Sequence, residues 1–154
     1  MKTALRKITI DGNLFLWNRK HVHGKDNEGK GCTEKVTIYL EGFKQAPLYL
    51  FFNESDNTLV MDDPEKERWC IGYPESGVIW LSTYKPPLPP GQVYSPEEQQ
   101  TAELNLNRPA AIETLIRYYQ SNGWDPRKSV KPFVDDKALK ILEFISFPKE
   151  NTQL

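Results

Sequence analysis

The stretch "KITIDGNLFLW", residues 7–17, is the first strong signal for the fold. Apolar and polar residues alternate on both sides of Asp11-Gly12, a dipeptide that adopts positive φ readily and favours a tight turn between antiparallel strands. We therefore expect strands over residues 7–10 and 14–17. If the second strand continues, one of its faces holds Phe15, Trp17, Arg19, His21 and His23, and it begins in the core and ends in solvent.

Four further segments of the N-terminal half have the composition of strands. "EKVTIYLEGF" (34–43) and "APLYLFFN" (46–53) are rich in β-branched and aromatic residues and are separated by a glycine-containing turn, which predicts a second hairpin. "NTLVMDD" (57–63) is a shorter candidate, and "GVIWLSTY" (77–84) is a stronger one. These segments predict five or six strands before residue 85.

One long helix is expected over about residues 108–122, within "NRPAAIETLIRYYQSNGW" (107–124). Its apolar stripe has the spacing i, i+3, i+4 and i+7 and consists of Ile112, Leu115, Ile116 and Tyr119. Pro109 suits the first turn, where its missing N–H is not needed. Gly123 is expected to end the helix in the left-handed conformation, with Trp124 as the apolar contact that follows it.

These elements predict an α+β fold, in which a mostly antiparallel sheet of about five or six strands carries one main amphipathic helix. The length of 154 residues suits a single domain over 1–154. We divide it into a sheet-forming part (5–84), a proline-rich connector (85–96) and a helix with a C-terminal segment (107–147). The pattern over 135–147 fits a short helix or a terminal strand equally well.

The connector contains four prolines between residues 86 and 90, which favour an extended polyproline conformation. It could be a ligand for a proline-recognising groove or a stiff link between the sheet and the helix. Its position inside the predicted domain favours the link.

Composition excludes several classes of protein. Twenty basic and twenty-one acidic side chains give a formal net charge of -1, so nothing attracts the whole chain to nucleic acid or anionic lipid, and such binding would have to be local. The first residues contain no apolar run long enough for a signal peptide or a membrane span, and we expect a cytoplasmic location. In that compartment Cys32 and Cys70 are expected to be free thiols.

Both histidines and one cysteine lie within "WNRKHVHGKDNEGKGC" (17–32). In an extended strand His21 and His23 lie about 6.6 Å apart on one side, so both imidazoles could bind one zinc ion. Cys32 would be the third ligand, with a fourth from Cys70, Asp26 or Glu28.

Three features oppose this metal site. Cys32 has no partner at Cys-x-x-Cys spacing, no glutamate follows a histidine at the spacing of a catalytic motif, and Lys20 and Lys25 would repel a cation. The alternative is that His21 and His23 are solvent-exposed side chains at the end of a strand.

The sequence contains no motif of nucleophilic or phosphate chemistry. It lacks a Gly-x-Ser-x-Gly elbow and a Gly-Lys-Ser/Thr phosphate loop, so we assign no catalytic residue and no cofactor other than the possible zinc ion. The charges are segregated instead. Six acids lie between residues 54 and 67, whereas 19–30 and 125–131 are basic on balance.

Two functions follow as hypotheses. The first is a non-enzymatic binding module that docks a protein partner through charged loops, with Arg19, Lys20 and Lys25 as contacts and without nucleic-acid or membrane binding. The second is a small metal-binding protein or metal-dependent hydrolase that uses His21, His23 and Cys32.

Two short patterns carry a resemblance to a known group of proteins. A hairpin ending in "LFLW", followed downstream by an amphipathic helix that closes with "GWDP" (123–126) and by "KPF" (131–133), resembles small bacterial proteins of unknown function. The resemblance covers the two ends of the chain. It implies a bacterial, cytosolic single domain and carries no catalytic residues.

Overall fold

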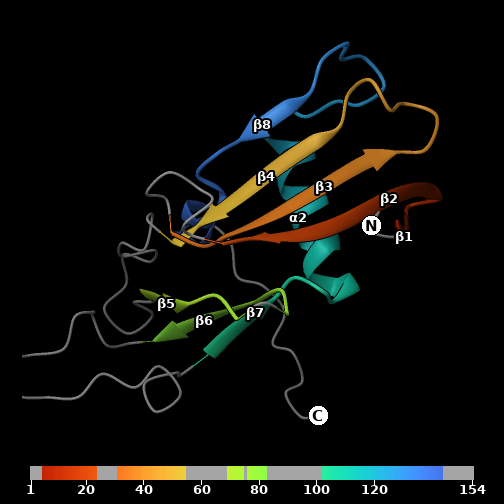
Figure 1. The fold of residues 1–154 in the computed structure, drawn as a ribbon. Coiled ribbons are helices and arrows are strands. Elements are labelled where there is room, and N and C mark those ends of the chain that lie inside the picture. The colour runs from red at the N-terminus through yellow and green to blue at the C-terminus, as the bar shows by residue number, and fades with distance from the viewer. Residues whose placement is uncertain (1–4, 24–30, 55–68, 75, 83–101, 144–154) are drawn as a thin grey trace, which may run out of the picture.

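The computed structural model describes residues 5–23, 31–54, 69–74, 76–82 and 102–143, and its fold is α+β (Figure 1). A five-stranded sheet has the order β1-β2-β3-β4-β8, and a three-stranded sheet has the order β5-β6-β7. The pairing is antiparallel except between β4 and β8. The predicted fold class, with its mostly antiparallel sheet and one main helix, is confirmed.

The first hairpin joins β1 (Arg6–Ile10) to β2 (Asn13–Val22). Asp11 and Gly12 form the turn with φ of 52° and 82°, so both central residues adopt the left-handed conformation that a two-residue hairpin turn requires. The strand β2 is longer than predicted, and it continues past Trp17 to Val22, so that it includes His21 and ends just before His23. This extension positions the candidate site.

The rest of the large sheet follows from a second hairpin and one distant strand. The strands β3 (Thr33–Leu40) and β4 (Leu48–Asn53) lie within or next to the predicted segments. The edge strand β8 (Phe133–Asp135) runs parallel to β4, with Leu48 opposite Phe133. It is followed by the 3₁₀ helix η3 (Ala138–Glu143), so the undecided segment 135–147 begins with the end of a strand and continues as a short helix.

The small sheet contains one predicted strand and two that the sequence did not indicate. The predicted strand is β6 (Val78–Ser82), and its neighbours are β5 (Trp69–Gly72) and β7 (Ala102–Asn105). The strand predicted over 57–63 and the whole of the proline-rich connector (85–96) lie outside the described residues.

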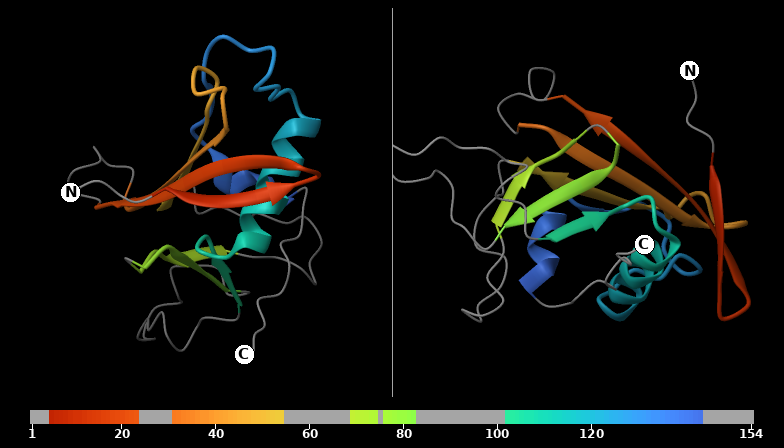
Figure 2. Two further views of the ribbon diagram at one scale, coloured as in Figure 1. Left: turned by 90° about the vertical axis from the view of Figure 1, so that its right-hand side faces the viewer. Right: turned by 90° about the horizontal axis from the view of Figure 1, so that it is seen from below.

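The core lies between the large sheet and the elements on one side of it. Figure 2 shows α2, η3 and the small sheet all on the same side of the five-stranded sheet. The apolar residues of β2 and β3 that face this side are Phe15, Trp17, Val36, Ile38 and Leu40, all buried. The predicted stripe of α2 is buried as well.

The helix α2 (Pro109–Ser121) ends as predicted. Gly123 has a φ of 110°, and the backbone N–H of Trp124 donates to the carbonyl of Tyr119 at 2.9 Å. This is the 6→1 hydrogen bond of a Schellman ending. The Trp124 indole N–H donates to the carbonyl of Ala46 at 3.0 Å, and its ring lies 6.1 Å from that of Phe15. Among the helices of the described residues, none has the length and apolar character to cross a membrane.

Candidate metal-binding site

The end of β2 and the start of β3, where the chain passes from one strand to the other, bring together the three residues that the sequence singled out as metal ligands. His21 belongs to β2, His23 follows it, and Cys32 precedes β3. The nitrogen and sulfur atoms that each could offer to an ion all lie within 4.8 Å of one another. They converge because β2 and β3 pair in register up to Val22 and Thr33, so the residues just beyond this pair meet.

The exposure of the two imidazoles differs from what the sequence predicted. His23 is exposed, but the side chain of His21 is only 8% exposed, so the expectation that both lie in solvent is wrong for His21. The physical reason is the alternation along β2, which keeps His21 on the covered side of the sheet with Phe15 and Trp17. The two imidazole rings pack edge to face, with centroids 5.0 Å apart.

Glu34 lies directly opposite His21 in the β2–β3 register and is fully buried. Its carboxylate is hydrogen-bonded through Oε2 to Nδ1 of His21, and Oε1 accepts a hydrogen bond from Nη1 of Arg19 at 3.2 Å. Burial raises the pKa of Glu34, although contacts with His21 and then Arg19 act in the opposite direction. The three side chains form one buried polar cluster.

This contact determines what the other ring nitrogen of His21 is able to do. With Nδ1 paired to the carboxylate, Nε2 is left as the second hydrogen-bonding atom of the ring. The Nε2 atom is buried and has no hydrogen-bond partner among the described residues. A histidine that binds a metal ion commonly has its second nitrogen hydrogen-bonded to a carboxylate, which fixes the orientation and tautomer of the ring.

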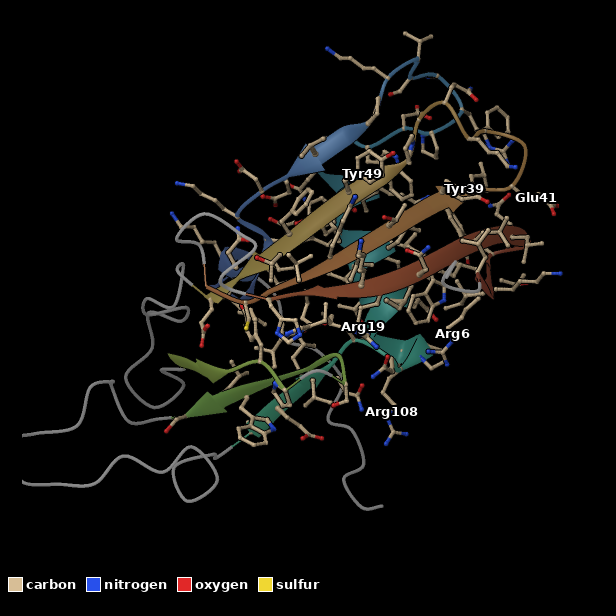
Figure 3. All side chains as sticks on the ribbon, in the orientation of Figure 1. Arg6, Arg19, Tyr39, Glu41, Tyr49 and Arg108 are labelled. Carbon is tan, nitrogen blue, oxygen red and sulfur yellow. The ribbon has the colours of Figure 1, made fainter. Side chains whose placement is uncertain are left out.

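Arg19, labelled in Figure 3, is partly buried, with a side chain that is 20% exposed. Besides its contact with Glu34, Arg19 donates a hydrogen bond from Nε to Oδ1 of Asn107 at 3.1 Å. Asn107 is in turn hydrogen-bonded to the carbonyl of Ser76. Arg19 therefore connects the large sheet to the turn between β5 and β6 and the end of β7.

Of the two lysines that were expected to repel a cation, only Lys20 belongs to the described residues. Lys20 is exposed and, by the alternation of β2, lies on the opposite face of the sheet from His21. Lys25, Asp26 and Glu28 lie outside the described residues, as does the side chain of Cys70.

Backbone contacts hold Cys32 at the start of β3. Its N–H donates to Oε1 of Glu54 at 3.1 Å, and its carbonyl accepts the N–H of Glu54 at 2.9 Å. The Cys32 thiol is free of any disulfide. These two hydrogen bonds to Glu54 fix the backbone of Cys32, and with it the position of the thiol, at the start of β3.

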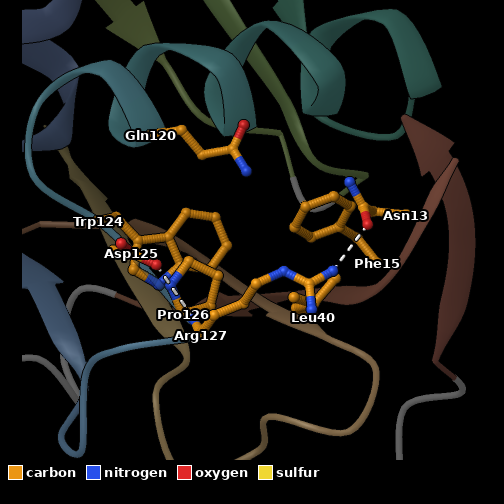
Figure 4. A pocket seen from close by; sticks show the side chains of 8 residues that line it. All are labelled: Asn13, Phe15, Leu40, Gln120, Trp124, Asp125, Pro126 and Arg127. Carbon is orange, nitrogen blue, oxygen red and sulfur yellow. Dashed lines mark hydrogen bonds between the residues drawn. The ribbon is translucent and has the colours of Figure 1, made fainter. Parts of the chain in front are cut away.

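A second hollow lies at the other end of β2, between the residues after α2 and the first hairpin (Figure 4). Arg127 Nη2 donates to Oδ1 of Asn13 at 2.8 Å, and the Arg127 N–H donates to Oδ1 of Asp125 at 3.2 Å. Phe15 and Trp124 line it too. Several polar groups of this hollow therefore pair with one another. Their contacts attach the "GWDP" segment to the first hairpin, and they do not form a set of metal ligands.

Glu34 is the residue of the candidate site that sequence reasoning missed. Strand alternation places it on the same face as Val36 and Ile38, both fully buried, so a carboxylate on a core-facing position was the available signal. The partners of Glu34, which are His21 and Arg19, could not be predicted from the sequence in this way, because they depend on the register between β2 and β3.

Comparisons of this chain with models of protein families, with curated proteins and with solved structures find no match.

Proposed function

We propose that the protein binds a transition-metal ion, with zinc as the first candidate, through His21, His23 and Cys32. Two observations carry the proposal: one potential ligand atom from each of His21, His23 and Cys32 lies within 4.8 Å of the other two, and the Nε2 of His21 is buried without a hydrogen-bond partner among the described residues. Glu34 supports it, since a carboxylate on Nδ1 is the usual second contact of a metal-binding histidine.

Zinc is favoured by the chemistry of the donor atoms. Two imidazole nitrogens and one thiolate are the borderline-soft ligands that zinc takes in tetrahedral sites. Three protein ligands leave a fourth position. A water molecule there would make the site catalytic and permit the hydrolase alternative, whereas a fourth side chain would make it structural.

The docking hypothesis has less support. Of its three proposed contacts, Arg19 is bound to Glu34 and Asn107, and its side chain is only 20% exposed. Lys20 is exposed but belongs to the opposite face of the sheet, and Lys25 is outside the described residues.

The direct test is metal content. The purified protein, incubated with zinc chloride and desalted, is expected to retain one equivalent of zinc by elemental analysis. His21→Ala and Cys32→Ser are expected to lose it, whereas the control Lys20→Ala, one position away on the other face, is expected to retain it. A folded protein that retains no zinc, or a His21→Ala variant that retains as much as the parent, would contradict the proposal.

A further inference from the structure

The large sheet has a second face, turned away from α2, η3 and the small sheet (Figures 1 and 2). No helix or strand of the described residues covers it. The pairing registers place on this face every second residue of the strands, namely Lys7, Thr9, Leu14, Leu16, Asn18, Lys20, Val22, Thr33, Lys35, Thr37, Tyr39, Tyr49, Phe51, Asn53 and Val134. We call these residues the open face.

The charge of the open face is positive, although the chain as a whole is slightly acidic. Lys7, Lys20 and Lys35 belong to it, and none of the strand residues placed there is an aspartate or a glutamate. The next acidic residue after Lys35 in the sequence is Glu41, which lies in the turn after β3. A local basic surface is thus present on a chain with a formal net charge of -1.

Aromatic rings lie among these lysines. Lys35 is at the centre, with its Nζ 5.0 Å from the ring centroid of Tyr49 and 5.5 Å from that of Phe51. Figure 3 shows Tyr39 and Tyr49 on neighbouring strands of the sheet. Because Tyr49 and Phe51 alternate along β4, they present two rings on one side of the same strand.

We propose that the open face binds single-stranded nucleic acid. Bases stack on aromatic side chains whatever their identity, and lysines beside the rings neutralise the phosphates that connect the bases. In a duplex the bases are already stacked on one another and would not be available to stack on the aromatic side chains of the open face. An acidic polypeptide would satisfy the lysines but has no flat surfaces to stack on the tyrosines.

This proposal predicts weak sequence preference and a specific dependence on salt. If all three lysines contact phosphates, the logarithm of the association constant falls against the logarithm of salt concentration with a slope of about −2. Lys35→Glu is expected to weaken binding strongly. Tyr49→Leu keeps an apolar side chain but removes the ring, and it is expected to weaken binding on the order of tenfold.

The experiment is a fluorescence-anisotropy titration of the full-length protein with short labelled oligo(dT) at low salt. Lys128→Glu is the matched control, because it reverses a charge on a residue outside the open face whose side chain is 86% exposed. It is expected to bind like the parent. His21→Ala is expected to bind like the parent as well, which separates this proposal from the metal site.

Three results would overturn the proposal. The first is absence of binding at low salt. The second is equal loss of binding in Lys128→Glu and Lys35→Glu, which would indicate non-specific charge attraction. The third is equally effective competition by duplex DNA or polyglutamate, which would leave no role for stacking. Tyr39→Leu provides a second ring variant if Tyr49→Leu does not melt cooperatively.

Discussion

His21 and Glu34 lie opposite each other on β2 and β3, and the imidazole Nδ1 is hydrogen-bonded to a fully buried carboxylate. The pair depends on the register of the two strands, since a slip by one residue would move every side chain of a strand to the opposite face. The contact orients the ring so that Nε2 is the atom left for another ligand. The geometry of the candidate metal site therefore depends directly on the register between β2 and β3.

The first prediction concerns the charge on Nδ1 of His21. Glu34→Gln preserves shape and an acceptor oxygen but removes the negative charge that makes Nε2 a better ligand. We expect the dissociation constant for zinc to rise by about 10- to 100-fold, measured by competition with a chromogenic chelator. Glu113→Gln, on the exposed side of α2, is the control and should leave the constant unchanged. Equal affinity in Glu34→Gln and the parent would show that the carboxylate does not support the ligand.

The second prediction concerns the close approach of Gly77 to Arg19. A Cβ on Gly77 would lie 2.2 Å from Nε of Arg19, whereas one on Gly42 would meet nothing within 4 Å, and both glycines have φ near +90°. Gly42→Ala should cost about 1 kcal/mol of unfolding free energy from backbone strain alone. Gly77→Ala should cost clearly more in a urea melt, because the guanidinium must leave its place beside Glu34 and Asn107.

Arg19→Ala gives a double-mutant cycle for this contact. In that background the collision is gone, so Gly77→Ala should cost no more than Gly42→Ala does. Additive costs in the cycle would mean that the two residues do not interact.

The third prediction concerns Tyr119, which connects α2 to β8. Its hydroxyl donates to Oδ2 of Asp135 at 2.6 Å. Burial, and then this hydrogen bond, raises the pKa of Tyr119 well above its ordinary value of 10.0. Tyr119→Phe should lower the free energy of unfolding by about 1 kcal/mol at neutral pH.

The sign of the pH effect follows from that direction. Above about pH 10 the phenol ionises freely in the unfolded chain but not in the folded one, so the parent loses stability as pH rises. The phenylalanine variant lacks this loss. The difference between the two proteins should narrow above pH 10 in denaturant melts, and a gap that widened there would contradict the assignment.

The fourth prediction concerns the end of α2. Gly123 has a φ of 110°, and a Cβ there would meet only Phe133, at an ordinary contact distance of 3.6 Å. Gly123→Ala should therefore cost about 1 kcal/mol, from the left-handed backbone and not from a collision. An unchanged urea midpoint would show that the ending tolerates a side chain without strain.

The sequence predicts those parts of the fold that local signals determine. Asp11-Gly12 identifies the first hairpin, and the stripe of α2 together with Gly123 identifies the helix and its end. Strand β8 is only three residues long and becomes a strand through its pairing with β4, more than 80 residues earlier in the chain. Strands β5 and β7 have only four residues each. Such short strands are stabilised by pairing with strands that are distant in the sequence, so the local sequence pattern does not predict them.

The candidate site divides in the same way. Residue type and spacing identify His21, His23 and Cys32 as potential ligands. The burial of His21 and its pairing with Glu34 arise from strand register, and the contacts of Arg19 with Asn107 arise from the packing of two sheets. Distances along the chain do not determine either of these.

The most direct test of the metal site is a titration of the metal-free protein with cobalt(II), followed by absorption spectroscopy. A thiolate ligand produces an intense sulfur-to-cobalt charge-transfer band in the near ultraviolet. We expect this band to saturate at one equivalent, to disappear on addition of zinc, to persist in Lys20→Ala and to be absent in Cys32→Ser. A titration that produces no band, or a band of the same intensity in Cys32→Ser, would contradict the assignment of His21, His23 and Cys32 as a metal site.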